Sequence, residues 1–246
     1  MKGGGLLNPP TNTPRRLRAS EKARLALAAS VLTTVALYFI PGGRYVIYPL
    51  LLLSTLAHEI GHGVAAVLVG GSFERFVMYP DGSGVATWAG PSSRLAIAFV
   101  AAGGLVGPAV VAGVGFAAGR TAKGSRRALW VGVVLLALAL LLVVRNVFGV
   151  VFVLVLGAVC LLVALRASQE VAQLTLLFLA VQLALSVYSR SSYLFTPMAE
   201  TATGAMPSDV AQIEAALWLP YWFWGGLCGL FSLAVVVLGL RAFWRS

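Results

Sequence analysis

The chain has 246 residues, of which 59% are hydrophobic and only 11% are charged, and its formal net charge is +10. Soluble domains usually carry about 25% charged residues, so this composition provides too few charges for a surface that faces water. The apolar residues also fall in long blocks. These observations exclude an ordinary soluble domain and favour the lipid bilayer as the solvent.

Seven apolar runs approach the length of about 20 residues that a helix needs to cross the hydrocarbon core. Their lengths favour helices over strands, so the sequence predicts an all-α membrane protein, a polytopic helical bundle. Two runs that flank Arg145 are also compatible with one long broken helix, which gives six to eight spans, with seven as the best estimate. The runs are residues 24–40, 44–70, 93–119, 128–144, 147–165, 170–188 and 217–240.

The N-terminal segment is basic and rich in proline. We expect residues 1–23 to be a disordered cytoplasmic tail and residues 24–246 to form a single transmembrane domain. The first apolar run has no convincing cleavage site before Pro41, and a second run follows almost at once, so we interpret it as a retained signal anchor. The positive-inside rule assigns its basic flank to the cytoplasm, which accounts for much of the charge without a nucleic-acid partner. The flank consists of Lys2, Arg15, Arg16, Arg18, Lys22 and Arg24.

A second basic cluster, between the third and fourth runs, conflicts with this orientation. It falls on the opposite side of the membrane from the N-terminal flank if all three preceding runs span. Because the N-terminal flank is larger and inserts first, we predict a cytoplasmic N-terminus and, by counting spans, an active centre toward the cytoplasmic side of the cell membrane. The second cluster consists of Arg120, Lys123, Arg126 and Arg127.

The loop after the second run has an ordered pattern. Two β-prone stretches, residues 73–79 and 84–88, flank the strong turn signal Pro80-Asp81-Gly82. The sequence therefore predicts a β-hairpin over about 72–90, associated with the membrane surface. The two cysteines, Cys160 and Cys228, lie inside apolar runs and indicate neither a disulfide framework nor a cysteine metal site.

The second run contains His58-Glu59-Ile60-Gly61-His62, and the two histidines of this motif are the only ones in the chain. Residues four apart on a helix lie about 40° apart and about 6 Å along the axis, so His58 and His62 can bind one Zn²⁺. Glu59 can approach a metal-bound water as general base. A chance match is the alternative, but ionisable groups inside a membrane helix are costly and mark functional sites by default.

The order of several short motifs adds a resemblance to a family. The HExxH motif in a membrane helix is followed by Gly70-Gly71 and the hairpin, and then by a glycine-rich element, Gly103–Pro108, in the third run. With Arg145-Asn146, Ser186-Val187-Tyr188 and Ser208-Asp209, the chain resembles the site-2 protease family, in particular its compact bacterial and plant branch without a PDZ domain. The resemblance covers nearly everything after residue 44. It implies a zinc protease whose partners are the lipid bilayer and a membrane-protein or membrane-associated peptide substrate; it does not indicate the oligomeric state.

The resemblance also implies a third, carboxylate ligand, usually an Asp in an Asn…Pro…Leu-Asp-Gly motif. This chain has Asn146 but no acid after it in that stretch. Glu200 and Glu214 are candidates, and we choose Asp209 because it fits the Ser-Asp element and enters the final run on the active side. The alternative for Ser208-Asp209 is an ordinary helix start. Asn146 is expected to complete the site or hold substrate, and Arg145 to orient the site or to snorkel.

The resulting prediction is an intramembrane zinc metalloendopeptidase with Glu59 as the catalytic base. Two other functions fit parts of the sequence. A catalytically silent relative is suggested by the missing Leu-Asp-Gly acid. A metal or small-molecule transporter is suggested by histidines in a membrane helix, but a transporter should have polar residues distributed over several spans, whereas this chain concentrates them in one.

Overall fold

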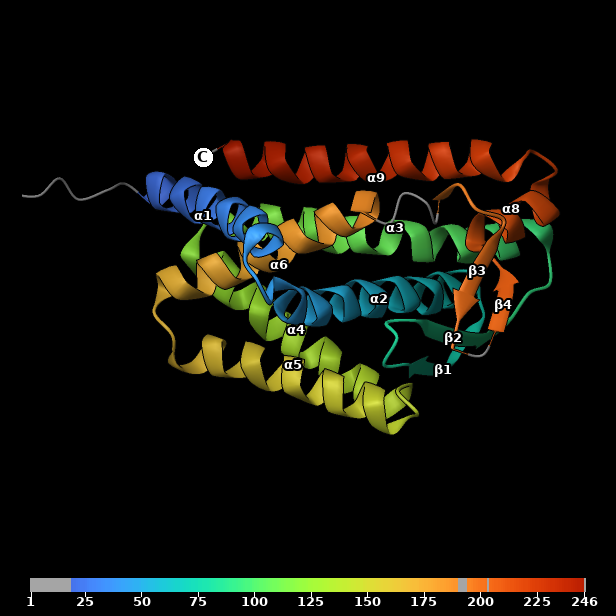
Figure 1. Cartoon of the computed structure of the whole chain (residues 1–246), viewed down its shortest axis with the longest axis horizontal. Coiled ribbons are helices and arrows are strands. Elements are labelled where there is room, and N and C mark those ends of the chain that lie inside the picture. Colours follow the sequence, from blue (N-terminus) through green and yellow to red (C-terminus); the bar gives the residue numbers. More distant parts are fainter. Residues whose placement is uncertain (1–18, 190–193, 203, 246) are drawn as a thin grey trace, which may run out of the picture.

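The structure is a computed structural model that describes residues 19–189, 194–202 and 204–245. It is a bundle of long helices with two small β-hairpins at one end (Figure 1). The elements in chain order are α1 (Ala19–Phe39), α2 (Gly43–Leu68), β1 (Ser72–Met78), β2 (Gly84–Ala89), α3 (Arg94–Gly119), α4 (Ala122–Leu142), α5 (Val147–Arg166), α6 (Gln169–Ser189), β3 (Met198–Thr201), β4 (Gly204–Pro207), α8 (Asp209–Leu217) and α9 (Tyr221–Trp244).

Six of these helices, α2 to α6 and α9, are long and apolar enough to cross a membrane. They expose many large apolar side chains, as expected for surfaces that face lipid. The prediction of a polytopic helical bundle is therefore confirmed, and the six candidate spans among the residues that the structure describes lie within the predicted range of six to eight. Helix α1 carries Glu21, Lys22 and Arg24 in its first turns. Its remaining apolar part is about 22 Å long at 1.5 Å per residue, which is shorter than a hydrocarbon core of about 30 Å.

Helix α1 runs in the same direction as α6. Lys22 Nζ lies 3.0 Å from Glu170 Oε1, and Gln182 Nε2 donates to Thr34 Oγ1; both pairs join residues 148 positions apart. The start of α1 therefore lies beside the start of α6, at the end of the bundle opposite the hairpins (Figure 1). Because α2 also runs toward the hairpins and follows α1 after a short turn, α1 cannot cross the whole bilayer before α2 does.

The structure does not test the predicted orientation in the membrane. The sequence interpretation assigned the N-terminus and the active centre to the same, cytoplasmic side, which requires α1 to cross the membrane and α2 to return. In the structure, the start of α1 lies at the end of the bundle opposite the hairpins, away from the histidine end of α2. The predicted tail boundary also shifts, because α1 begins at Ala19 rather than at residue 24; residues 1–18 lie outside the described part of the chain.

Small residues allow α2 and α3 to pack closely. A Cβ atom added to Gly107 would lie 2.7 Å from the Ala57 carbonyl oxygen, and one added to Gly103 would lie 2.8 Å from the Gly61 oxygen. Any side chain at these glycines would push the helices apart. Such small-residue contacts are typical of membrane helices, where packing rather than water exclusion drives association. Helix α3 consequently lies directly against the face of α2 that carries the HExxH motif.

The predicted hairpin is present as the antiparallel pair β1–β2, in which Met78 is paired with Gly84. Two hydrogen bonds attach its turn to α2. Tyr48 donates to the Pro80 carbonyl at 2.6 Å, and Thr55 donates to the Gly82 carbonyl at 2.7 Å. These contacts hold the hairpin along the same helix that carries the histidines.

The outer edge of β1 is occupied by the segment that joins α4 and α5. Phe76 donates its backbone N–H to the Val143 carbonyl at 2.7 Å, and Arg145 donates its own to the Phe76 carbonyl at 3.0 Å. Asn146 then holds both backbone groups of Met78, accepting from its N–H at 3.2 Å and donating to its carbonyl at 2.6 Å. Asn146 therefore supports the hairpin. The Arg145 guanidinium donates to the Val144 carbonyl at 2.9 Å, at the end of α4 and away from the histidines.

Three features near the C-terminal end were not predicted. The segment before the Ser-Asp element forms a second antiparallel hairpin, β3–β4. Its Ala202 N–H donates to Ser83 Oγ at 3.2 Å, which joins it to the turn of the first hairpin. Asp209 also does not enter the final span directly, because the chain forms the short helix α8, turns at Trp218 in a left-handed conformation (φ 65°), and only then begins α9.

We expect Asn146→Ala to loosen the β1–β2 hairpin without unfolding the bundle. The change leaves the Met78 N–H and carbonyl without their side-chain partner, which typically costs about 1–3 kcal/mol. Hydrogen exchange should therefore become faster at Met78 and its neighbours in β1. Thr175→Ala, at an exposed hydroxyl that bonds only within α6, is the matched control. Unchanged exchange in β1 would show that Asn146 does not hold the hairpin.

Candidate metal centre

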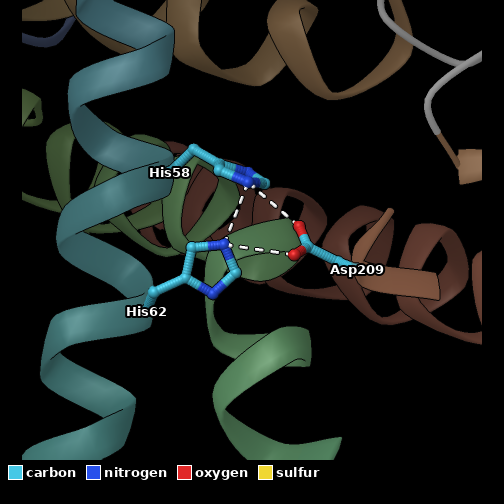
Figure 2. Close-up of side chains that lie close together, drawn as sticks. All are labelled: His58, His62 and Asp209. Carbon is cyan, nitrogen blue, oxygen red and sulfur yellow. Dashed lines mark hydrogen bonds and ion pairs between the residues drawn. The ribbon is translucent and has the colours of Figure 1, made fainter. Parts of the chain in front are cut away.

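The HExxH motif lies within the uninterrupted part of α2, so both histidines project from one side of the helix (Figure 2). Their ring centroids are 4.7 Å apart with nearly perpendicular planes, and their Nε2 atoms approach to 3.1 Å. Both side chains are largely buried, at 17% exposure for His58 and 12% for His62. The helical spacing thus brings two imidazole nitrogens to one point, as the sequence predicted.

Asp209 reaches the same point from the first turn of α8 (Figure 2). Its Oδ2 lies 3.0 Å from His58 Nε2 and its Oδ1 lies 3.4 Å from His62 Nε2, with the side chain only 5% exposed. The cap at the start of α8 is the preceding residue, Ser208. Ser208 Oγ accepts from the Ala211 N–H at 3.3 Å and donates to the Thr196 carbonyl at 2.6 Å. The carboxylate of Asp209 is therefore directed at the histidines rather than used as a cap.

The hydrogen-bond geometry of the cluster calls for a shared proton or a metal cation at its centre. His62 Nδ1 lies 2.9 Å from the Val100 carbonyl oxygen, which can only accept, so Nδ1 carries the hydrogen. Neutral His62 then presents the lone pair of Nε2 to the Asp209 carboxylate. Asp209 Oδ2, for its part, faces His58 Nε2 at 3.0 Å. Lone pairs this close repel one another unless a proton or a metal cation lies between them.

The spacing of the three groups fits a metal ion. Histidine and carboxylate ligands lie about 2.0–2.2 Å from zinc, so ligand atoms of a tetrahedral site are roughly 3.4 Å apart. The three distances between the nitrogen and oxygen atoms are 3.0, 3.1 and 3.4 Å. Burial raises the pKa of Asp209, but positive charge on His62 and His58, with their hydrogen bonds, outweighs burial and holds the pKa below its usual range. A carboxylate is the form of Asp209 that can bind a cation.

Glu59 lies next to this cluster and is 7% exposed. A Cβ atom added to Gly84 would lie 2.9 Å from Glu59 Cγ, so the glycine at the start of β2 gives the side chain its space. A cavity of about 140 Å³ is bordered by Glu59, both histidines and Asp209 together with residues of β2. A second cavity of about 320 Å³ borders His58 and Glu59 and extends toward the turn of the first hairpin and toward β3. A carboxylate, two imidazoles and two cavities thus meet between the two hairpins.

The structure brings together four of the predicted site residues, namely His58, Glu59, His62 and Asp209. Arg145 and Asn146 lie outside this group. Glu200 borders the larger cavity but is exposed and does not belong to the three-residue cluster. Sequence reasoning did not identify Val100, whose carbonyl orients His62, because a backbone acceptor leaves no trace in residue type. The glycine-rich element Gly103–Pro108 was noted, but not that Gly104 lies against the His62 ring.

The fold and this cluster define a helical membrane protein with a candidate metal centre built on an HExxH helix. A family model described as Peptidase M50B-like matches residues 26–239, which is most of the chain. The protein therefore belongs to this family of membrane metallopeptidases within the site-2 protease group. No curated protein and no solved structure matches the chain.

Metal analysis of single variants tests the three ligands. We expect purified protein to contain zinc, and the single changes His58→Ala, His62→Ala and Asp209→Ala each to abolish most of it. Changes outside the first ligand shell already cost about 10–100-fold in metal affinity, so loss of a ligand should cost more. Asp81→Asn removes an exposed carboxylate, whose pKa is lowered by hydrogen bonds from the Ser83 hydroxyl and N–H, and is the control. Full zinc content in Asp209→Ala would eliminate Asp209 as a ligand.

Gly104→Ala should displace His62 without altering any ligand atom. A Cβ atom at residue 104 would overlap the His62 ring, whereas one at Gly157 meets nothing within 4 Å. We therefore expect Gly104→Ala to weaken zinc binding by about 10–100-fold, as for other changes that misplace a ligand, and Gly157→Ala to leave it unchanged. Competition with a chelator measures both. Equal affinities in the two variants would contradict the tight fit of His62 against α3.

Proposed function

We propose that the protein is an intramembrane zinc metalloprotease that hydrolyses peptide bonds of membrane proteins. The observation that carries this proposal is the buried convergence of His58, His62 and Asp209 beside the carboxylate of Glu59. Membership of the Peptidase M50B-like family supports the same chemistry. A catalytic zinc site usually has three protein ligands and one open position, and the cluster offers three ligand groups.

When bound, zinc would supply a Lewis acid that lowers the pKa of water and polarises the scissile carbonyl. The three ligands would hold the ion, with Val100 fixing the ring of His62. Glu59 takes the proton from the attacking water and then delivers it to the leaving amine. Its position beside the smaller cavity is suitable for both transfers.

The substrate is expected to bind in an extended form, because the carbonyls of an intact helix are protected by their own hydrogen bonds. Strand β1 pairs with β2 on one side and with the segment around Val144 on the other. The outer edge of β2 is therefore the edge suited to pair with an unwound substrate by strand addition. Gly84, Val85 and Ala86 of β2 border the smaller cavity, which would place a paired substrate next to Glu59.

The acid missing from the Asn…Leu-Asp-Gly position is the main argument for a catalytically silent relative. Asp209 supplies a carboxylate to the two histidines from a different element, after the second hairpin rather than after Asn146. The chain thus retains a complete set of ligand types. This favours an active enzyme over a relative that has lost its metal.

Glu59→Gln tests catalysis separately from metal binding. We expect the variant to retain zinc, because Glu59 is not a ligand, and to lose cleavage by about 10²–10⁴-fold, the usual contribution of a general base. The assay follows cleavage of transmembrane substrate peptides in proteoliposomes, with zinc content measured on the same samples. Glu200→Gln, which changes an exposed acid at the larger cavity, is the control. Equal product from native protein and Glu59→Gln would remove the protease function.

A further inference from the structure

The smaller cavity at the candidate metal centre is bordered by an amide side chain that the mechanism above does not use. Apart from the two histidines and the two acids of the site, the described residues with polar side-chain groups on this cavity are Trp88, Thr201 and Gln212. The Thr201 hydroxyl donates to the Gly204 carbonyl at 2.7 Å. The Trp88 ring packs against the apolar cluster around Val100. Gln212 is therefore the remaining neutral donor beside the site.

The amide of Gln212 is weakly held. Its Nε2 donates to the Pro207 carbonyl at 3.4 Å, which is longer than the usual 2.7–3.2 Å for such a bond. The side chain is half-buried. A glutamine amide carries two N–H hydrogens, and the Pro207 carbonyl engages one of them. The second N–H can therefore donate to a molecule that occupies the cavity.

Helix α8 holds this amide at a fixed place relative to the ligands. Gln212 follows Asp209 by three residues, so the two side chains lie about 60° apart around the helix and about 4.5 Å apart along its axis. The opposite side of α8 is anchored by Val210 and Ile213, which are fully buried in a cluster with residues of α3. One short helix thus presents both a carboxylate and an amide to the same cavity.

The amide that the sequence led us to expect at the site is engaged elsewhere. Both polar groups of the Asn146 side chain are bound to the backbone of Met78, so Asn146 supports the hairpin instead of facing the cavity. The acid missing after Asn146 has its counterpart in Asp209 on α8. Gln212 gives the same helix an amide as well, so α8 carries both kinds of group that were expected near Asn146.

Peptide hydrolysis places a specific demand on such a donor. The water oxygen forms a bond to the scissile carbonyl carbon while Glu59 takes a proton from the water, and the electron pair of the C=O bond moves to the carbonyl oxygen. When the C–N bond breaks, its electron pair leaves with the nitrogen, which receives the proton from Glu59, and the C=O bond forms again. A donor already directed at the carbonyl oxygen stabilises the negative charge that develops there.

From these observations we propose that Gln212 is a catalytic residue, which donates a hydrogen bond to the carbonyl oxygen of the scissile bond as that oxygen becomes negatively charged. This role rests on the proposed protease function and adds a residue to it. The alternative is that Gln212 only ties the start of α8 to Pro207. The two roles differ in what they change. A transition-state contact lowers kcat and leaves KM unchanged, whereas a structural contact displaces Asp209 and lowers zinc content.

Gln212→Met tests the role, because methionine has a similar length but no N–H. The measurements on proteoliposomes are zinc content, kcat and KM for a transmembrane substrate peptide, and affinity for a phosphinic peptide, an uncleavable mimic of the tetrahedral geometry. We expect native zinc content and KM, and a kcat about 10²–10³-fold lower, as for loss of one such donor. Affinity for the phosphinic peptide should also fall, because it resembles the transition state.

Two further variants complete the experiment. Gln212→Glu keeps the shape of the side chain but replaces the donor by a carboxylate, so its kcat should fall at least as far. Gln169→Met, at an exposed position at the start of α6, is the matched control and should behave as the native protein.

The possible failures can be told apart. Loss of zinc in Gln212→Met, a raised KM with native kcat, or native affinity for the phosphinic peptide would each overturn the catalytic role of Gln212. Cleavage that requires Glu59 but is unchanged in Gln212→Met would overturn this role and leave the protease function standing. Absence of any cleavage that requires Glu59 in the native protein would overturn both.

Discussion

The repulsion among His58, His62 and Asp209 is the constraint on which the rest of the site depends. Three electron-rich groups lie within 3.4 Å of their neighbours at a buried point, so surrounding elements must hold them there. Helix α3 does most of this without contributing a ligand. Its glycines admit α2 at close range, its Val100 carbonyl fixes the ring of His62, and it also packs against α8, which carries Asp209.

Features that depend on local sequence patterns were predictable. Spans follow from run length, the first hairpin from a strong turn flanked by β-prone residues, and the pairing of His58 with His62 from helical spacing. Asp209 was different, because no local rule connects it to residues in α2. Its selection relied on a family resemblance and on the scarcity of acids. The structure brings its carboxylate to the histidines, but from a separate short helix rather than from the final span.

Features that depend on distant contacts were not predictable. The first apolar run has the composition of a span, and only its contacts with α6 reveal that it runs toward the hairpins. From the sequence, Asn146 is only a residue that precedes a helix. Its hydrogen bond with Met78 could not be predicted from that position. The strands β3 and β4 are four residues each and lack a run of β-branched residues. Their pairing is visible only once the loop is folded beside the first hairpin. The transporter alternative is not favoured by the candidate metal cluster, because its three residues meet at one point rather than along a path through the bundle.

The origin of the ligands along the chain has a further consequence. His58 and His62 belong to an early helix, whereas Asp209 follows after four further candidate spans and lies on an element outside the membrane helices. The centre can therefore be assembled only late in biosynthesis, when the C-terminal part arrives. Until then, the partly synthesised chain contains the two histidines without Asp209. A bound cation would consequently link the first and last parts of the chain. Completion of folding and the stability of the folded protein would then depend on metal supply.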